Sequence, residues 1–167
     1  MKHNNCEINI PYPPTAIGEP NLDYATLLMK DYAGPNGEFT ALTQYFYQYL
    51  ITKNHYSDFA AKMECISIIE MRHMEMLGEL IVLLGGKPVY AMCDCGKYVF
   101  WGSYNVLWTE NIQKFLLENI EGEKLAIKNY LKHIKQIKDY KIQEVLNRII
   151  KDEEYHITIF KEYLKYF

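Results

Sequence analysis

The sequence 68-IIEMRHMEMLGEL-80 predicts a buried helix with two polar residues on its apolar face. Glu70, His73, Leu77 and Leu80 follow one another at three- and four-residue spacing, which places all four on one side of a helix. An ionised carboxylate inside a protein is costly unless another group compensates its charge. The stretch therefore indicates that other polar side chains face Glu70 across the core.

The same combination of motifs occurs twice in the chain. EMRH at 70–73 matches EEYH at 153–156, and both read Glu-x-x-His. GEFTALTQY at 37–45 matches GEKLAIKNY at 122–130, and both read Gly-Glu-x-x-Ala-x-x-x-Tyr. The copies are offset by 85 residues for the Gly-Glu motif and by 83 residues for Glu-x-x-His. The chain is therefore predicted to contain two helical hairpins, each with Glu on one helix and Glu-x-x-His on the next.

Hydrophobic periodicity predicts helices over most of the chain after residue 20. The expected ranges are a short helix over 21–33 and long helices over about 38–53, 58–84, 109–137 and 141–166. Thr109 is the candidate N-cap of the third long helix. Residues 86–108 show no helical period and no alternating β-branched run, so they are expected to form a long crossover. The predicted fold is an all-α four-helix bundle of two hairpins joined by this crossover.

The N-terminal residues and the composition indicate the domain organisation, the class of protein and its location. Residues 1–20, with several Pro and Asn residues, are expected to form an extended arm, and residues 21–167 the bundle domain. With 49% hydrophobic and 23% charged residues, the composition indicates a globular protein. The formal charge of -3 does not favour nucleic-acid binding. No apolar run approaches the roughly 18 residues of a membrane span. Because the N-terminus also lacks a signal-peptide pattern, a cytoplasmic protein is expected.

The four cysteines, Cys6, Cys65, Cys93 and Cys95, do not form a recognisable metal motif. CDCG at 93–96 contains Cys-x-Cys rather than the Cys-x-x-Cys of zinc or thioredoxin-like sites. Reduced thiols are therefore expected, and the sequence assigns no role to Cys93 and Cys95.

Six polar residues each lie on the apolar stripe of a predicted helix. They are Glu38, Glu70, His73, Glu123, Glu153 and His156. In each hairpin the two glutamates are equidistant from the turn, because position 54 is midway between 38 and 70, and 138 is midway between 123 and 153. The four carboxylates are therefore expected to meet in one layer of the bundle.

Four ionised carboxylates in one layer would repel one another, and two divalent cations would balance their charge. Oxygen ligands combined with imidazole suit iron or manganese. We therefore predict that these six residues bind two iron or two manganese ions, with no catalytic residue beyond the ligands. Tyr45 and Tyr130 each follow a candidate glutamate by seven residues and are expected to hydrogen-bond a ligand carboxylate. Glu118 and Glu121 are alternatives to Glu123, and Glu121 is retained as an outer carboxylate.

These motifs resemble the ferritin-like superfamily, which includes bacterioferritins, rubrerythrins and the manganese-catalase-like proteins with their spore-coat relatives. EFTALTQYF at 38–46 resembles the first helix of bacterioferritins, and KDEEYHITIF at 151–160 resembles their fourth. YAGPNGE at 32–38 with EMRHMEM at 70–76 is more similar to the manganese-catalase-like group. The resemblance covers about residues 31–84 and 109–166, and it implies a ferritin-like four-helix bundle with the six ligands named above.

The resemblance implies an oxidoreductase whose two iron or manganese ions react with hydrogen peroxide or dioxygen, as a peroxidase, a catalase or a ferroxidase. An iron-storing ferroxidase and a spore-coat-like structural metalloprotein are the alternatives. Glu70, together with either Glu123 or Glu153, would bridge the ions. A rubredoxin-like module with two Cys-x-x-Cys pairs is absent from the sequence, so peroxidase turnover would need an external electron donor. A homodimer is the expected assembly.

Overall fold

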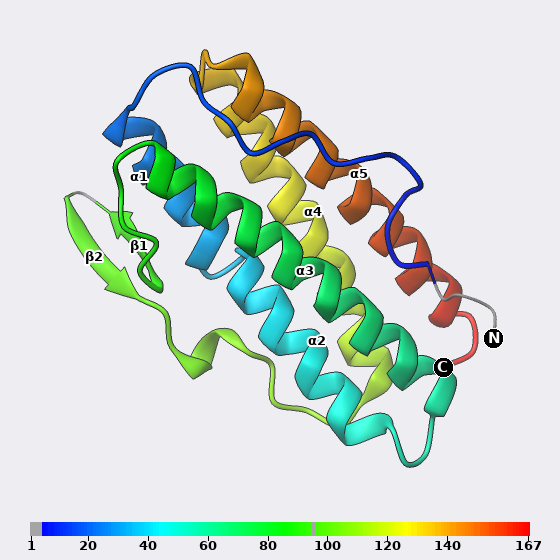
Figure 1. Cartoon of the computed structure of the whole chain (residues 1–167). Coiled ribbons are helices and arrows are strands. Elements are labelled where there is room, and N and C mark those ends of the chain that lie inside the picture. The colour runs from blue at the N-terminus through cyan, green and yellow to red at the C-terminus, as the bar shows by residue number, and fades with distance from the viewer. Residues whose placement is uncertain (1–4, 95) are drawn as a thin grey trace.

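A computed structural model of the chain describes residues 5–94 and 96–167 (Figure 1). Within those ranges, four long helices form a bundle of two hairpins. The helices are α2 (Glu38–Thr52), α3 (Ser57–Leu83), α4 (Ile112–Gln136) and α5 (Tyr140–Tyr163). α2 packs along α3, and α4 packs along α5. The predicted four-helix bundle of two hairpins is therefore confirmed.

The start of α4 differs from the prediction. Asn111, not Thr109, is the N-cap, and its side chain accepts the Lys114 N–H at 2.8 Å. The Thr109 hydroxyl instead accepts the N–H of Asn111 at 3.3 Å. The expected cap was wrong because two residues with capping side chains stand two positions apart, and the helix begins after the second.

The predicted short helix is α1 (Leu22–Ala33), which packs against α3. The Asn21 side chain caps it by accepting the N–H groups of Asp23 and Tyr24. Near its end, the Asp31 carboxylate lies 2.6 Å from Nδ1 of the buried His133 on α4. Burial raises the pKa of Asp31 to about 6, and the hydrogen bond with His133 partly counteracts that rise. This pair ties α1 to the second hairpin.

The crossover contains a β-hairpin that the sequence did not predict. Its strands are β1 (Ala91–Asp94) and β2 (Lys97–Phe100), paired antiparallel with Ala91 opposite Phe100. Neither strand alternates between buried and exposed positions, and all of β2 is exposed, so the sequence carries no period-two pattern there. Gly96 has a φ of 77°, a left-handed backbone conformation that favours glycine in a tight turn. Cys93 is a half-buried free thiol, and Cys95 lies outside the described residues.

After the β-hairpin, the crossover runs along α2. The Trp101 indole N–H donates to the Thr40 hydroxyl at 2.9 Å. The Gln44 side chain accepts from the Leu107 N–H at 2.6 Å and donates to the Leu107 carbonyl at 3.3 Å. These bonds fix the crossover against the first hairpin, so it covers the outer face of α2 in this structure.

The N-terminal residues 5–20 form no helix or strand and run over α3 and α5 (Figure 1). A disulfide joins Cys6 to Cys65 on α3, with 6.0 Å between their Cα atoms. The expectation of reduced thiols is therefore wrong for this pair. The two cysteines are 59 residues apart, and only the path of the arm brings them together. The division of the chain into an arm and a bundle domain stays a prediction.

The core consists of two apolar clusters with a polar layer between them. One cluster lies around α1 and includes Leu77 and Leu146. The other lies toward the opposite end of the bundle and includes Met63, Phe115 and Phe160. Along α3, the buried residues of the second cluster come before position 67 and those of the first come after position 73. The polar residues of α3 at positions 70–73 therefore lie between two well-packed apolar regions, which shield them from water.

A buried amide pair aligns the two hairpins beside this layer. The Gln48 side chain of α2 donates to Asn119 of α4 at 2.8 Å, and Asn119 donates back at 2.8 Å. Both side chains are buried, and these reciprocal bonds satisfy a donor and an acceptor on each. The pair fixes the height of α2 relative to α4.

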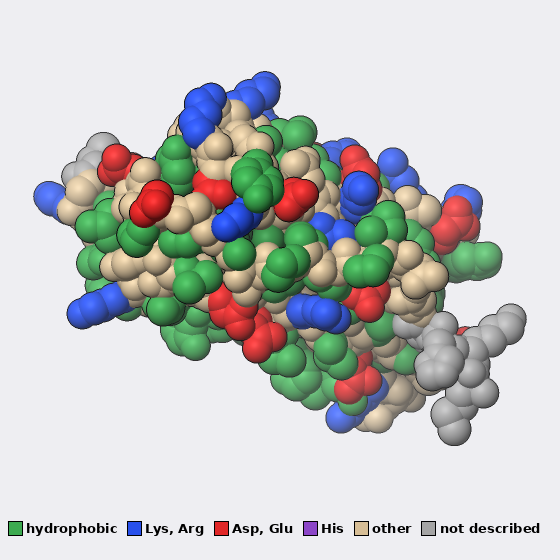
Figure 2. Space-filling model, turned by 45° about the horizontal axis from the view of Figure 1, so that its top comes forward, with side chains coloured by type: hydrophobic (Ala, Val, Ile, Leu, Met, Phe, Trp, Pro, Cys, Tyr) green, Lys and Arg blue, Asp and Glu red, His purple; other side chains and the backbone are tan. Residues whose placement is uncertain are grey.

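On one face of the molecule, acidic and basic side chains are interspersed with apolar ones (Figure 2). Charges of both signs occur side by side there, as expected from a formal charge of -3. Among the described residues, no helix is long and apolar enough to cross a membrane.

Candidate metal centre

The four bundle helices bring all six predicted residues into one buried cluster. Glu38 is the first residue of α2, and the turn before it requires glycine, since a Cβ on Gly37 would collide with the Asp31 carbonyl oxygen. The position also suits a carboxylate, because the amino end of a helix stabilises negative charge. The other five residues lie inside α3, α4 and α5, and each of the six side chains is at most 3% exposed.

His73 faces three carboxylates through its Nδ1 atom. This nitrogen lies 3.2 Å from Glu70 Oε2, 3.2 Å from Glu153 Oε1 and 3.6 Å from Glu38 Oε2. The three carboxylates come from α2, α3 and α5. Together with His73 they form a group of four ligand atoms that lie within 4.8 Å of one another.

His156 has an equivalent arrangement on the other side. Its Nδ1 lies 3.0 Å from Glu70 Oε1, 3.0 Å from Glu153 Oε2 and 3.4 Å from Glu123 Oε1. These residues form the second group of four ligand atoms within 4.8 Å of one another. Glu70 and Glu153 belong to both groups, and each directs one oxygen toward each imidazole. The repeated motif in the sequence therefore corresponds to a pseudo-symmetric cluster.

The outward nitrogens of the two imidazoles have different partners. His73 Nε2 lies 3.1 Å from Asp152 Oδ2, whereas His156 Nε2 lies 2.9 Å from the carbonyl oxygen of Cys6. A carbonyl oxygen only accepts hydrogen bonds, so the proton of a neutral His156 is on Nε2 and the lone pair of Nδ1 faces the carboxylates. The carboxylate of Asp152 favours the same tautomer in His73. Both rings are thus oriented as metal ligands commonly are.

Two tyrosines contact the cluster crosswise. Tyr45 on α2 donates to Glu123 Oε1 at 2.7 Å, and Tyr130 on α4 donates to Glu38 Oε1. Each tyrosine follows the glutamate of its own helix by seven residues but bonds the glutamate of the opposite hairpin. Both phenols are buried, so each orients one carboxylate and links the two hairpins.

The electrostatics of the cluster reflect four carboxylates held close together. Burial, with repulsion from Glu153 and Glu123, raises the pKa of Glu70 well above its usual value. Burial also raises the pKa of Glu123, to about 7. For Glu153, burial acts in the same direction, but attraction to the two imidazoles outweighs it and lowers the pKa. Burial and mutual repulsion therefore disfavour the ionised forms of Glu70 and Glu123, and bound cations would offset both effects.

The donor set fits divalent metal ions. Among the described residues, several buried ligand atoms make no well-aligned hydrogen bond, although they lie 3.0–3.2 Å from one another or from His73 Nδ1, namely Glu70 Oε1, both carboxylate oxygens of Glu153, and His156 Nδ1. Buried polar atoms without partners are rare in folded proteins, and they are common where an ion is bound. Four carboxylates and two imidazoles supply the hard oxygen and nitrogen ligands that iron and manganese accept.

A cavity of about 170 Å³ reaches the cluster between α2 and α4. Glu38, Glu123 and Glu153 line it, and Gly122 borders it. Glu121 also lines this cavity, but its side chain is 63% exposed and lies 2.6 Å from Lys124 Nζ, so the structure places it among surface groups. Glu118, the other alternative on α4, lines the cavity and is exposed. Neither of these two carboxylates belongs to the buried groups.

Four residues that contact the site were missed by sequence reasoning. Asp152 and Arg148 are an i,i+4 pair on α5 whose side chains lie 2.6 Å apart. Their spacing in the sequence, directly before Glu153, could have indicated an ion pair beside the ligands. Tyr12 and the Cys6 carbonyl come from the arm, and no local pattern links them to the helices.

Known proteins are similar to this chain in sequence and in fold. A family model described as "Ferritin-like domain" matches residues 35–167. The chain is 32% identical over 164 residues to the "Probable manganese catalase" of Clostridium acetobutylicum, covering 86% of this chain and 71% of that protein. It is also 32% identical over 125 residues to a bacterioferritin of Desulfovibrio desulfuricans, covering 74% of this chain and 66% of that protein.

Solved structures agree at the level of the fold. The crystal structure of KatB, a manganese catalase from Anabaena PCC7120, matches with a TM-score of 0.85 and 23% identity, over 95% of this chain and 78% of KatB. The Desulfovibrio desulfuricans bacterioferritin matches with a TM-score of 0.71 and 24% identity, over 86% of this chain and 78% of that chain. The family model spans most of the chain and contains all six clustered residues, and the predicted resemblance is confirmed: the chain belongs to the ferritin-like domain family.

Proposed function

We propose that this protein is an oxidoreductase that binds two manganese or iron ions and acts on hydrogen peroxide. The observation that supports this proposal is the pair of four-residue groups that share Glu70 and Glu153. Because each shared glutamate directs one oxygen to each side, these two would bridge the ions, and Glu38 and Glu123 would each bind one ion. Four negative carboxylates balance two divalent cations, which relieves the repulsion within the cluster.

The chain itself would supply geometry, shielding and access. When bound, the two ions would supply redox chemistry, giving electrons to one peroxide, which is reduced to water, and taking electrons from another, which is oxidised to dioxygen. Tyr45 and Tyr130 hold one carboxylate each in place, and the apolar clusters on both sides exclude water. The cavity between α2 and α4 would admit a small substrate to Glu123 and Glu153.

Two relatives favour different reactions. The similarity to a protein named as a probable manganese catalase, which covers the larger share of this chain, supports disproportionation of peroxide without an external electron donor. The similarity to a bacterioferritin supports iron oxidation as the second candidate. A homodimeric assembly, an external donor, a cytoplasmic location and a spore-coat-like structural role stay predictions.

Metal loading separates the two reactions. Protein stripped of metal and reloaded with Mn²⁺ is expected to consume peroxide without a reductant and to release about one dioxygen for every two peroxides. An oxygen electrode and a peroxide assay, run with and without ascorbate, measure this ratio. Consumption that requires the reductant and releases no dioxygen would indicate a peroxidase instead. If Fe²⁺-loaded protein retains iron far above two ions per chain and leaves peroxide untouched, the storage alternative holds and the proposal is wrong.

Gly122 provides a test of the access route. A Cβ added at this position meets no atom within 4 Å, so a larger side chain would extend into the cavity. We expect Gly122→Leu to lower kcat/KM for peroxide by roughly tenfold while the bound metal stays unchanged, because the route narrows and the ligands do not move. Gly122→Ala is the matched control, expected to stabilise the helix by about 0.5–1 kcal/mol with little effect on turnover. Normal kinetics in the leucine variant would show that peroxide enters elsewhere.

A further inference from the structure

The N-terminal arm contacts the outward side of both histidines in the metal centre. The carbonyl oxygen of Cys6 accepts from His156 Nε2 at 2.9 Å. The Tyr12 hydroxyl lies 3.3 Å from His73 Nε2 and donates to Asp152, the carboxylate partner of that ring, at 2.5 Å. The arm therefore supplies one group to the surroundings of each imidazole, although none of its described residues belongs to the two ligand groups.

The Tyr12 end of the arm is fixed by stacking and hydrogen bonds. The Tyr12 ring lies between two guanidinium groups, 4.2 Å from that of Arg72 and 4.0 Å from that of Arg148. Arg148 also donates to the Ile10 carbonyl at 2.9 Å, and the Ile8 N–H donates to Asp152 at 2.9 Å. These contacts hold the middle of the arm on α3 and α5 without any covalent bond.

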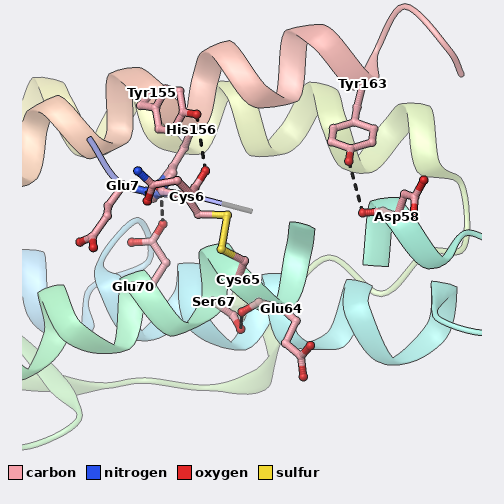
Figure 3. The surroundings of a disulfide bond; sticks show 11 residues. Cys6, Glu7, Asp58, Glu64, Cys65, Ser67, Glu70, Tyr155, His156 and Tyr163 are labelled. Carbon is pink, nitrogen blue, oxygen red and sulfur yellow. Dashed lines mark hydrogen bonds and ion pairs between the residues drawn. A yellow bond between two sulfur atoms is a disulfide. The ribbon is translucent and has the colours of Figure 1, made fainter. Parts of the chain in front are cut away.

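The Cys6 end of the arm is fixed by a covalent bond. Figure 3 shows Cys6 between α3 and α5, with its sulfur bonded to Cys65 on one side and its carbonyl directed at His156 on the other. Cys65 lies on α3 only five residues before Glu70, a shared carboxylate of the cluster. The disulfide thus ties the hydrogen-bond acceptor of His156 to the helix that carries Glu70 and His73.

We propose that Cys6 and Tyr12 are positioning residues of the metal centre and that the Cys6–Cys65 bond makes the orientation of His156 redox-dependent. The inference rests on the proposed metal site and adds a control to it. With the bond intact, the Cys6 carbonyl holds the proton of His156 on Nε2 and keeps Nδ1 directed at the carboxylates. With the bond reduced, the start of the arm can leave α5, and His156 loses the acceptor that orients it.

The reductant is a dithiol, and its point of attack follows from exposure. Cys6 is 1% exposed, whereas Cys65 is half-buried, so a thiolate of the dithiol reaches the sulfur of Cys65 first. Attack forms a mixed disulfide with Cys65 and releases the sulfur of Cys6 as a thiolate, which takes up a proton. The second thiol of the reductant then displaces Cys65. Two electrons and two protons have passed to the two cysteines, and the dithiol has become a disulfide.

The first test observes His156 directly, in full-length ¹⁵N-labelled protein, both metal-free and loaded with diamagnetic Zn²⁺. We expect the Nε2–H proton of His156 to be protected from solvent exchange in the oxidised protein and to exchange rapidly after dithiothreitol treatment. The variant Cys6→Ser/Cys65→Ser is expected to match the reduced protein. Cys93→Ser removes the free cysteine of β1 and is the matched control, expected to match the oxidised wild type. Reduction of folded wild type gives the same comparison if the double variant fails to fold.

The second test measures metal retention by trapping released Mn²⁺ with a chelator. Loss of an outer hydrogen-bond partner typically costs about 10–100-fold in metal affinity, so we expect release to accelerate within that range on reduction. Tyr12→Phe, which keeps the ring between the two guanidinium groups, is expected to accelerate release from the His73 side. If neither the His156 proton nor the release rate changes while the melting temperature falls, the disulfide is only a structural cross-link and the proposal is wrong. The exchange measurement on metal-free protein is independent of whether the loaded protein consumes peroxide.

Discussion

Glu70→Ala is expected to abolish the binding of both metal ions and with it the peroxide activity. Glu70 belongs to both ligand groups, and its two oxygens lie 3.2 Å from His73 Nδ1 and 3.0 Å from His156 Nδ1. The loss of a shared ligand should therefore exceed the roughly 100-fold upper range seen for changes in outer-shell partners. Elemental analysis of the purified variant should find less than one ion per chain, and turnover should fall in parallel.

The same variant should respond differently when metal is absent. Burial and the neighbouring carboxylates raise the pKa of Glu70, so its ionised form is unfavourable in the metal-free protein. Removing the carboxylate relieves that repulsion, which stabilises the metal-free fold. The cavity left behind destabilises the fold and opposes this gain. In wild type, Mn²⁺ at about 100 times its Kd should stabilise the fold by about 2.7 kcal/mol. Calorimetry should find that this metal-dependent increase in melting temperature disappears in Glu70→Ala.

Two further variants make the assignment specific. Glu38→Ala leaves the group around His156 complete, so it should retain one ion instead of none. Glu75→Ala removes an exposed carboxylate from the same helix and should leave metal content unchanged. Equal metal content in Glu70→Ala and wild type would contradict the assignment of Glu70 as a shared ligand.

The repeat explains why so much of the site could be predicted from the sequence. A single Glu-x-x-His occurs by chance on many helices, but a second copy 83 residues later, paired with a repeated Gly-Glu motif, requires a common cause. Helical periodicity then places Glu70 and Glu153 on inward faces, and short turns bring the helices of each hairpin to matched heights. Position along a helix therefore sufficed to predict which side chains meet.

The parts that could not be predicted depend on long-range paths of irregular chain. The Cys6–Cys65 disulfide and the bond from Cys6 to His156 exist because the arm crosses α3 and α5, and no local pattern specifies that path. The sequence also left open whether Glu123 or Glu153 is shared, because both glutamates face inward. The structure distinguishes them by their neighbours. Glu153 lies between both imidazoles, whereas Glu123 lies beside His156 alone.

Asp152→Ala is expected to destabilise the fold and to weaken metal binding at the same time. Its carboxylate lies 2.6 Å from the Arg148 guanidinium and 3.1 Å from His73, and all three side chains are buried. Burial alone would raise the pKa of Asp152, but hydrogen bonds from His73, Tyr12 and the Ile8 N–H lower it to about 2. Removing one member of a buried ion pair leaves the other charge uncompensated, at a cost of about 3–5 kcal/mol.

The pH dependence of this effect has a definite sign. The folded-state pKa of Asp152 lies below the ordinary aspartate value of 3.8, so its stabilisation is present at neutral pH and is lost as pH falls from about 4 toward 2. The difference in unfolding free energy between wild type and Asp152→Ala should therefore be largest near pH 7 and shrink on acidification. Glu154→Ala, which removes the exposed carboxylate two positions along α5, should show neither the destabilisation nor this pH dependence.

Asp152→Asn separates the two roles of this carboxylate. The amide keeps the size of the side chain and can still accept the Ile8 N–H, so it should recover the part of the stability that comes from packing and this hydrogen bond, but not the part that comes from the ion pair with Arg148. The amide lacks the negative charge that keeps the proton of His73 on Nε2. The Asp152→Asn protein should therefore still bind Mn²⁺ about 10–100-fold more weakly than wild type. Chelator-competition titrations at pH 7 measure this affinity, and urea unfolding measures stability. If metal affinity followed stability across both variants, Asp152 would act on packing alone and would not position His73.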